Sequence, residues 1–212
     1  MAFAADPATH AYYERRATEY DDWWAGTGLF AARERPGWHE EVDAVVGLVR
    51  DLPAARTLDV ACGTGFLTRH LRGPLVVGLD QSAAMAAIAQ SRLGPGGVTL
   101  IADALALPFA DGAFDRVFTG HFYGHLEPGE RAAFLAEARR VARELVVVDS
   151  ALRDGVEPEQ WQERTLNDGS RHQVFKRFLT AEGLAEEIGG QALLSGTWFV
   201  AARAGPPART TS

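Results

Sequence analysis

The amino-acid sequence predicts an α/β domain in which a mostly parallel β-sheet is covered by helices on both faces. Short apolar segments of strand length alternate with amphipathic segments of helix length along most of the chain. Two glycines, Gly63 and Gly65, separate the first such strand from the next segment, as in a strand, turn and helix unit. With 212 residues, of which 47% are hydrophobic, the chain suits one domain with a full core.

The N-terminal segment is interpreted as an amphipathic helix over residues 9–24. Its apolar face is formed by Tyr13, Ala17, Tyr20 and Trp24, which recur at the spacing of a helix. That face must be buried, and the simplest partner is the edge of the sheet. Glycines and a proline interrupt the following stretch, so residues 26–37 are predicted to be a loop or hinge. Residues 1–37 are therefore expected to form a helical segment ahead of the main domain, which is expected over residues 38–204.

A cleaner helix is predicted over residues 38–51, with valines on one face and acidic residues near its positive N-terminal end. Residues 57–61 are the first buried strand, and a helix is expected to begin at Phe66. The later strands are predicted at residues 75–80, 98–102, 115–121 and 145–149, and the later helices at residues 82–93 and 128–143.

The pattern loosens after Asp149. Residues 153–170 are polar without a clear period and are predicted to be a loop or a cap-like insertion. Residues 171–178 alternate weakly, Thr180 caps a helix that ends at Gly189, and residues 192–202 supply the last strand. The tail, residues 205–212, is predicted to be disordered because it has few apolar residues.

The acidic residues around the glycine turn indicate which ligand the turn binds. A dinucleotide-binding turn has a third glycine and an acid about 20 residues further on. Here Thr68 takes the place of the third glycine, and Asp80 comes only fifteen residues after Gly65. Asp59 in the first strand would repel a pyrophosphate but attract a ligand that carries an ammonium and a sulfonium. That ligand is S-adenosylmethionine (SAM).

Four motifs in order, LDVACGTG, VVGLDQSAAM, IADALALPF and FDRVFTGHF, make residues 10–150 resemble the class I SAM-dependent methyltransferases. The sequence is most similar to the small quinone-biosynthesis-like group of methyltransferase types 11 and 25. The resemblance implies a Rossmann-like fold with a seven-stranded, mostly parallel sheet. Ala61 stands where the family often has glycine, and we expect it to keep the turn uncrowded.

The resemblance also implies a set of cofactor-binding residues. Asp80 would accept both ribose hydroxyls, Asp103 the adenine amino group, and the Ala104 N–H would donate to a ring nitrogen. Gln81 would border the adenosine, Asp59 would hold the turn near the methionine ammonium, and Tyr20 on a closing N-terminal lid would reach the same end. The expected cofactor-binding residues are Tyr20, Asp59, Ala61, Gly63, Gly65, Asp80, Gln81, Asp103, Ala104 and His121. Aspartates that only cap a helix or a turn are the simpler alternative for Asp80 and Asp103.

The end of the fourth strand carries the catalytic candidates. His121 and His125 lie where the sulfonium methyl should point, and an imidazole is well suited to take a proton at neutral pH. A base is needed only if the acceptor must lose a proton. His172 and Lys176 share a strand face and could roof the pocket, although ordinary surface side chains explain both. A metal site of His121, His125 and His172 matches no standard spacing, so no metal is expected.

The composition of the chain limits which binding partners and which cellular compartment we expect. A net charge of −7 without a basic run argues against nucleic acid and favours a small-molecule acceptor, methylated at oxygen, nitrogen or carbon. The single cysteine, Cys62, excludes an internal disulfide and suggests a reducing cytoplasm. No apolar run is long enough for a membrane span or patterned as a secretion signal. We expect a monomer or homodimer, and the alternatives are a SAM-binding protein that transfers no methyl and, less favoured, an NAD-dependent oxidoreductase.

Overall fold

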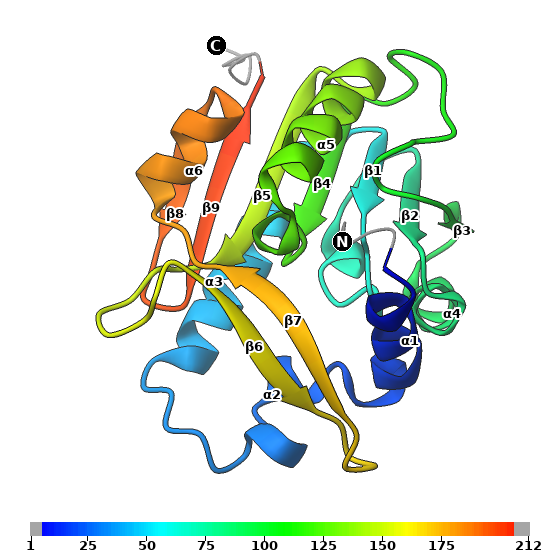
Figure 1. The fold of residues 1–212 in the computed structure, drawn as a ribbon. Helices are drawn as coiled ribbons and strands as arrows, with labels where there is room; N and C mark the ends of the chain where they lie inside the picture. Colours follow the sequence, from blue (N-terminus) through cyan, green and yellow to red (C-terminus); the bar gives the residue numbers. More distant parts are fainter. Residues whose placement is uncertain (1–5, 206–212) are drawn as a thin grey trace.

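The computed structural model describes residues 6–205 and contains the predicted seven-stranded sheet. The strand order is β3-β2-β1-β4-β5-β9-β8 (Figure 1), with β1 to β5 parallel and the last two strands antiparallel to their neighbours. The Rossmann-like α/β fold is thereby confirmed. The strands are β1 (Thr57–Val60), β2 (Val76–Asp80), β3 (Gly97–Ile101), β4 (Arg116–Gly120), β5 (Glu144–Ser150), β8 (Gln191–Ser195) and β9 (Phe199–Ala204).

Helices cover both faces of the sheet, as the near-continuous apolar strands require. In β5, Val147 faces one core and its neighbours Val146 and Val148 face the other, because successive side chains of a strand point to opposite faces. Helices α5 and α6 pack on the first face, and α3 packs on the second (Figure 1). The helices are α3 (Trp38–Asp51), α4 (Ala83–Arg92), α5 (Pro128–Val141) and α6 (Ala181–Ile188), close to the predicted bounds.

The predicted helix after the glycine turn is wrong. Residues 66–71 contain only the 3₁₀ turn η4 (Thr68–His70), and Leu71 is already extended. Gly73 and Pro74 follow at once, and a proline disfavours helical backbone in the residue before it. The chain must also return to β2 at Val76, so there is no room for further helical turns.

The single helix predicted over residues 9–24 is also wrong in its continuity. The segment consists of α1 (Pro7–Arg16), the 3₁₀ turn η2 (Ala17–Glu19) and the short helix α2 (Asp22–Ala25). The break lies at Asp21, whose carboxylate accepts a hydrogen bond from the Thr64 hydroxyl at 2.6 Å and pairs with Arg92 at 2.6 Å. These contacts hold the segment against the glycine turn and α4, and Ala17 and Trp24 of the predicted stripe are buried.

The polar insertion is a β-hairpin rather than a loop. Strands β6 (Glu159–Thr165) and β7 (Arg171–Arg177) pair antiparallel and leave the main sheet (Figure 1). The sequence of β6, EQWQERT, has few apolar residues because the hairpin is a separate two-stranded ribbon with no sheet packed on most of its surface. Most of the segment predicted as a loop or insertion over residues 153–170 thus belongs to a hairpin that runs to the end of β7.

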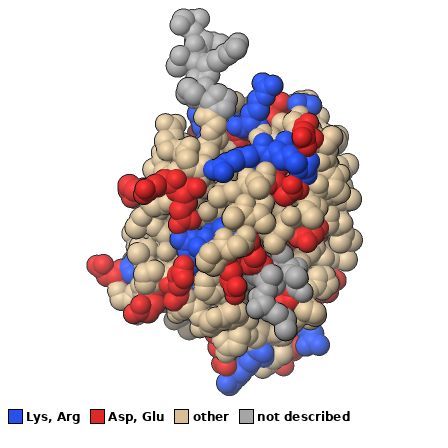
Figure 2. Space-filling view, turned by 45° about the horizontal axis from the view of Figure 1, so that its top comes forward, with Lys and Arg blue, Asp and Glu red and all other residues tan. Residues whose placement is uncertain are grey.

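Charged side chains of both signs are spread over the protein surface. Figure 2 shows carboxylates and basic side chains interspersed over the face that it displays. Within residues 6–205 every helix is too short or too polar to cross a bilayer. Residues 206–212 of the tail that was predicted to be disordered, and residues 1–5 of the N-terminal segment, lie outside the described residues.

Candidate active site

A cavity lies at the carboxyl ends of β1, β2 and β4. This is the edge at which open parallel sheets bind ligands. Most of the predicted site residues meet in its wall, which is lined by Tyr13, Tyr20, Ala61, Gly63, Leu79, Asp80, Gln81, Met85, Ala102, Ala104, Gly120, His121, Phe122 and His125. We call this space the cofactor cavity.

Asp80 ties the glycine turn to the next strand. One of its carboxylate oxygens accepts the Gly63 N–H at 2.8 Å, and the other accepts the Ser82 N–H at 2.9 Å. Burial raises the pKa of Asp80, and these backbone donors oppose the rise by stabilising its charged form. Each oxygen has a second lone pair, so the carboxylate can also accept hydroxyl groups of a ligand.

The two glycines of the turn have different tasks. Gly63 has a φ of +54° and lies against the Tyr20 ring, at the wall of the cavity. Gly65 has a φ of +76°, but a Cβ there would lie 3.1 Å from the backbone Cα of Ala89. Gly65 therefore allows α4 to pack closely on the turn, and it does not line the cofactor cavity.

Two residues in the cavity wall have strained backbones. Ala61 has a φ of 57° and His121 a φ of 58°, and they are the non-glycine residues in the left-handed region within the described chain. They follow β1 and β4 directly. The glycine common in the family at the position of Ala61 is thus explained by backbone conformation rather than by crowding. Such strain of about 1 to 3 kcal/mol per residue is typical of functional sites.

Asp59 and Trp24 line a smaller hollow beside the cofactor cavity. Asp59 is buried, and one of its carboxylate oxygens accepts the Thr68 hydroxyl at 2.6 Å. Its other oxygen and the indole N–H of Trp24 are buried without a hydrogen-bond partner. Burial raises the pKa of Asp59 to about 8, against the opposing effect of Thr68. One unpartnered acceptor and one unpartnered donor in the same hollow suit a ligand with an ammonium and a carboxylate.

Of the three residues predicted to contact the adenosine, two line the cofactor cavity and one does not. Ala104 and Gln81 line the cavity. Asp103 is exposed and accepts the Leu105 N–H at 2.8 Å, as a turn aspartate does, and it is not part of the cavity wall.

His121 is held in an aromatic cluster. Its ring makes edge contacts with Trp23, Trp24 and Phe199 at centroid distances of 4.7, 5.0 and 5.4 Å. The Nδ1 atom lies 3.4 Å from the Ser150 hydroxyl, and Nε2 is buried without a partner. Burial lowers the pKa of His121 to about 3, which makes the imidazole neutral and only weakly basic at neutral pH.

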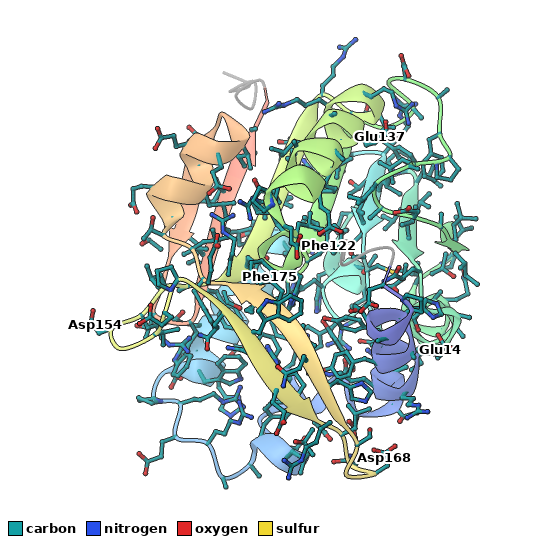
Figure 3. All side chains as sticks on the ribbon, in the orientation of Figure 1. Glu14, Phe122, Glu137, Asp154, Asp168 and Phe175 are labelled. Carbon is teal, nitrogen blue, oxygen red and sulfur yellow. The ribbon has the colours of Figure 1, made fainter. Side chains whose placement is uncertain are left out.

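His125 is fixed by the hairpin. Its Nδ1 donates to the Phe175 carbonyl at 2.6 Å, where β7 meets the segment after β4; Figure 3 labels Phe175 and Phe122 at this place. Nε2 is then the nitrogen with the lone pair. Burial and the Lys176 ammonium hold the pKa of His125 well below its usual value.

Beneath both imidazoles lies a buried ion pair that the sequence did not reveal. Lys176 Nζ is 2.5 Å from Asp149 Oδ1, and Asp149 also accepts the N–H groups of Gly124 and Ser150. Burial would raise the pKa of Asp149, but the charge and hydrogen bond of the Lys176 ammonium outweigh burial and lower this pKa to about 2. The sequence predicts Asp149 as the end of a strand and leaves Lys176 either in the roof of the pocket or at the surface, because nothing local in the sequence pairs residues 27 positions apart. The structure buries Lys176, so the surface explanation is wrong for this residue.

Helix α1 is fastened over the cavity by Glu14, which Figure 3 labels and which sequence reasoning missed. Its carboxylate accepts the Ser82 hydroxyl at 2.6 Å and the Ala84 N–H at 3.1 Å, at the N-terminus of α4. His10 on the same helix donates to the Gln81 carbonyl at 3.0 Å. Only the folded arrangement could identify these contacts, since they join residues about 70 positions apart.

The other residues considered from the sequence, Cys62 and His172, pack against neighbouring residues of the fold. Cys62 is buried, its sulfur packs against Gly78, and burial raises the pKa of its thiol. His172 packs on Tyr12 at a centroid distance of 5.0 Å. Among residues 6–205 no three His, Cys, Asp or Glu side chains are placed to hold a metal ion.

The arrangement fits SAM. Asp80 offers acceptors for hydroxyl groups, and the unpartnered atoms of Asp59 and Trp24 offer an acceptor and a donor for an amino-acid group. The aromatic and apolar walls, formed by Tyr20, Leu79 and Met85, suit a purine and a thioether.

Comparison with known proteins agrees with this geometry. The family described as "Methyltransferase domain" matches residues 58–146. Demethylmenaquinone methyltransferase of Thermotoga maritima is 35% identical over 103 residues, 47% of this chain and 44% of that protein. Phthiotriol/phenolphthiotriol dimycocerosates methyltransferase 1 of Mycobacterium ulcerans is 34% identical over 143 residues, 62% of this chain and 50% of that protein. The chain thus spans about half the length of the curated relatives it matches.

Among solved structures, a complex of DhpI with SAM and HEP has a TM-score of 0.73 and 25% sequence identity, over 94% of this chain and 96% of that one. A complex of DhpI with S-adenosylhomocysteine (SAH) has a TM-score of 0.71 at the same identity, over 95% and 97%. In its fold, its glycine turn and the match over residues 58–146, the chain is similar to SAM-dependent methyltransferases.

Proposed function

We propose that this protein is an enzyme that transfers the methyl group of SAM to a small-molecule acceptor. The observation that carries the proposal is that the cofactor cavity adjoins a second cavity, and that Tyr13, Tyr20, His121 and His125 line both. A methyl group that leaves the first cavity at this shared wall meets a molecule held in the second. We call the second space the acceptor cavity.

Each end of the cofactor has proposed partners. Asp80 accepts the ribose hydroxyls, and Gln81 and Ala104 border the adenosine. Asp59 and the Trp24 indole hold the methionine end, near Gly63. Asp103 remains a candidate for the adenine amino group, but its exposure and its turn hydrogen bond make it the weakest of the set.

The N-terminal segment is proposed to act as a lid. Helix α1 and Tyr20 cover the cofactor cavity, and the contacts of Glu14 and Asp21 fasten the segment to α4 and the glycine turn. The lid would exclude water and must open for the cofactor to enter. The hairpin β6 and β7 is proposed to be the cap over the acceptor.

SAM supplies a methyl group on a sulfonium, which an acceptor lone pair can take as the carbon–sulfur bond breaks and SAH is left. The protein's task is to align the nucleophile and to exclude water. His121 and His125 are proposed to touch the acceptor. Both are neutral, with pKa values lowered by burial, so they are better suited to orient the acceptor than to remove a tightly held proton.

The partners follow from the same reasoning. A small molecule is favoured over nucleic acid by the net charge of −7. The relatives named for demethylmenaquinone make a quinone-like acceptor one candidate class. A monomer or homodimer in the cytoplasm is part of the proposal, and the buried, free thiol of Cys62 supports a reducing compartment.

The proposal is tested in two stages. SAH should raise the melting temperature, because a ligand that binds only the folded state stabilises it, whereas NAD should not. Mass spectrometry should then detect an acceptor that gains one methyl group per SAH formed. Stabilisation by NAD alone would indicate an oxidoreductase, and SAH binding without turnover on any acceptor would indicate a SAM sensor.

Once an acceptor is known, His121→Ala and His125→Ala separate base catalysis from orientation. A base should show intact SAM affinity with a loss in single-turnover rate of about a hundredfold or more. Orientation predicts a smaller loss that does not change with pH. Parental turnover in both variants would remove the histidines from the acceptor site.

A further inference from the structure

The acceptor cavity has an unusual charge for this protein. The chain carries a net charge of −7, yet basic side chains from five separate stretches of the sequence meet in the wall of this one cavity. They are Arg16, Arg33, Arg35, Arg153, Arg164 and Lys176, against a single carboxylate, Glu163.

Little within the protein neutralises these charges. Glu163 pairs with Arg171, 3.3 Å away and not part of the cavity wall, and Lys176 is balanced by Asp149. Within residues 6–205 none of the five arginines forms an ion pair with a carboxylate at 4.0 Å or less. Their partners are neutral, such as the Tyr12 hydroxyl for Arg16 and the Trp23 carbonyl for Arg35.

Arg164 on β6 is the clearest case of a buried basic side chain that lacks a hydrogen-bond partner for one of its donors. Its terminal nitrogen donates to the Gln162 side chain at 2.5 Å, but its Nε is buried without any partner. Burial and the positive charge of Arg16 lower the pKa of Arg164, which would be raised by an anion beside it. Buried donors of this kind normally have a partner.

The rest of the wall is aromatic. Trp23, Trp38, Trp161, Trp198 and Phe178 line the cavity, and the Arg153 guanidinium lies 4.3 Å from the Trp198 ring. Such a wall buries an apolar or aromatic body, while arginine forks bind planar or tetrahedral oxyanions through paired hydrogen bonds. Cationic walls with no anion would only cost desolvation energy.

We infer that the methyl acceptor is a small organic anion, whose phosphate, phosphonate or carboxylate group is bound by Arg164 and its basic neighbours in the acceptor cavity. The inference rests on the proposed function, because it names the substrate class of the same site. It also bears on the histidines: if the anionic oxygen is itself the nucleophile, no proton has to be removed.

The test measures binding to the full-length protein saturated with SAH, so that it does not depend on turnover. Phenylphosphonate, benzoate, benzyl alcohol and benzylamine share one ring and differ in charge. Calorimetry should find binding of one or both anions, at least about tenfold tighter than the alcohol, and none of the amine. Added salt should weaken the anions and leave the alcohol unchanged. Tighter binding of phenylphosphonate than of benzoate would indicate a phosphonate or phosphate, and the reverse a carboxylate.

Variants locate the binding. Arg164→Gln and Arg153→Gln should each weaken the anion about tenfold to a hundredfold. Arg143→Gln removes the same charge at the amino end of β5, whereas the acceptor cavity lies near the carboxyl ends of the parallel strands. This control variant should leave the affinity for the anion unchanged. Thermal unfolding and SAH affinity, measured for every variant, show that the fold and the cofactor site are intact.

Equal affinity for benzyl alcohol and both anions, or equal losses in Arg143→Gln and Arg164→Gln, would overturn the inference while the proposed function stands. Failure of SAH itself to bind would instead refute the proposed function. The two failures are therefore distinguishable in one set of titrations.

Discussion

The ionisation of Asp59 should make cofactor binding depend on pH. In the ligand-free protein burial raises its pKa to about 8, so the carboxyl is about nine-tenths protonated at pH 7. An ammonium placed beside its unpartnered oxygen would stabilise the carboxylate and expel that proton. Binding of SAH at pH 7 should release about 0.9 proton, and its Kd should fall about ninefold from pH 6 to pH 7 and about fivefold from pH 7 to pH 8.

Calorimetry in buffers of different ionisation enthalpy measures the released protons directly. Asp59→Asn should abolish the release and flatten the dependence on pH, whereas Asp115→Asn, which alters an exposed carboxylate paired with Arg56, should preserve both. Proton release that persists in Asp59→Asn, or a Kd independent of pH in the parent, would refute the assignment of Asp59 to the ammonium.

The same pKa has a consequence for stability. A carboxyl whose folded pKa lies above its unfolded value of 3.8 binds more protons in the folded state between these two values. The free energy of unfolding of the ligand-free protein should therefore fall as the pH rises from about 4 to about 8. Asp59→Asn removes this contribution and should be more stable than the parent at pH 8.

Four further predictions follow from other contacts. Asp80→Asn should weaken SAH binding by roughly 1.5 to 3 kcal/mol in calorimetry, since an amide cannot accept from Gly63, Ser82 and the ribose together; parental affinity would make Asp80 a turn residue only. Lys176→Met should cost about 3 to 5 kcal/mol in urea unfolding, because it leaves Asp149 buried and unpaired, and a loss below 1 kcal/mol would contradict the buried pair. Ala61→Gly should gain about 1 kcal/mol by relieving a positive φ, whereas a destabilised variant would show that Ala61 is unstrained. Hydrogen exchange over residues 7–25 should slow when SAH binds, and equal protection with and without ligand would make this segment a fixed element rather than a lid.

Much of the fold could be read from the sequence because strands and amphipathic helices carry local periodicity. The helices predicted over residues 38–51 and 82–93 agree closely with α3 and α4. Their buried faces, and a cap such as Ser82, can be recognised from residues that are close in the sequence. The helix expected after Gly65 failed because Gly73 and Pro74 leave it no length. The polar strand β6 failed because its pairing with β7 is what makes it a strand.

The sequence predicted the residues of the candidate site that lie in local motifs, but not those that distant segments bring together. Asp80, Gly63, Ala104 and His121 were found because they stand at fixed places in motifs that follow strands. The donors and acceptors that come from distant segments were missed. No local pattern brings Glu14 to the N-terminus of α4, Lys176 to Asp149, or the arginines of the acceptor cavity to one another.

The most direct test of the central claim is a crystal structure of the protein with SAH. The account predicts the ribose hydroxyls at Asp80, the ammonium at Asp59, and the sulfur directed at the wall of Tyr13, Tyr20, His121 and His125, with the basic cavity beyond it. A cofactor whose sulfur points away from that wall, or whose ribose lies apart from Asp80, would contradict the proposed path of the methyl group.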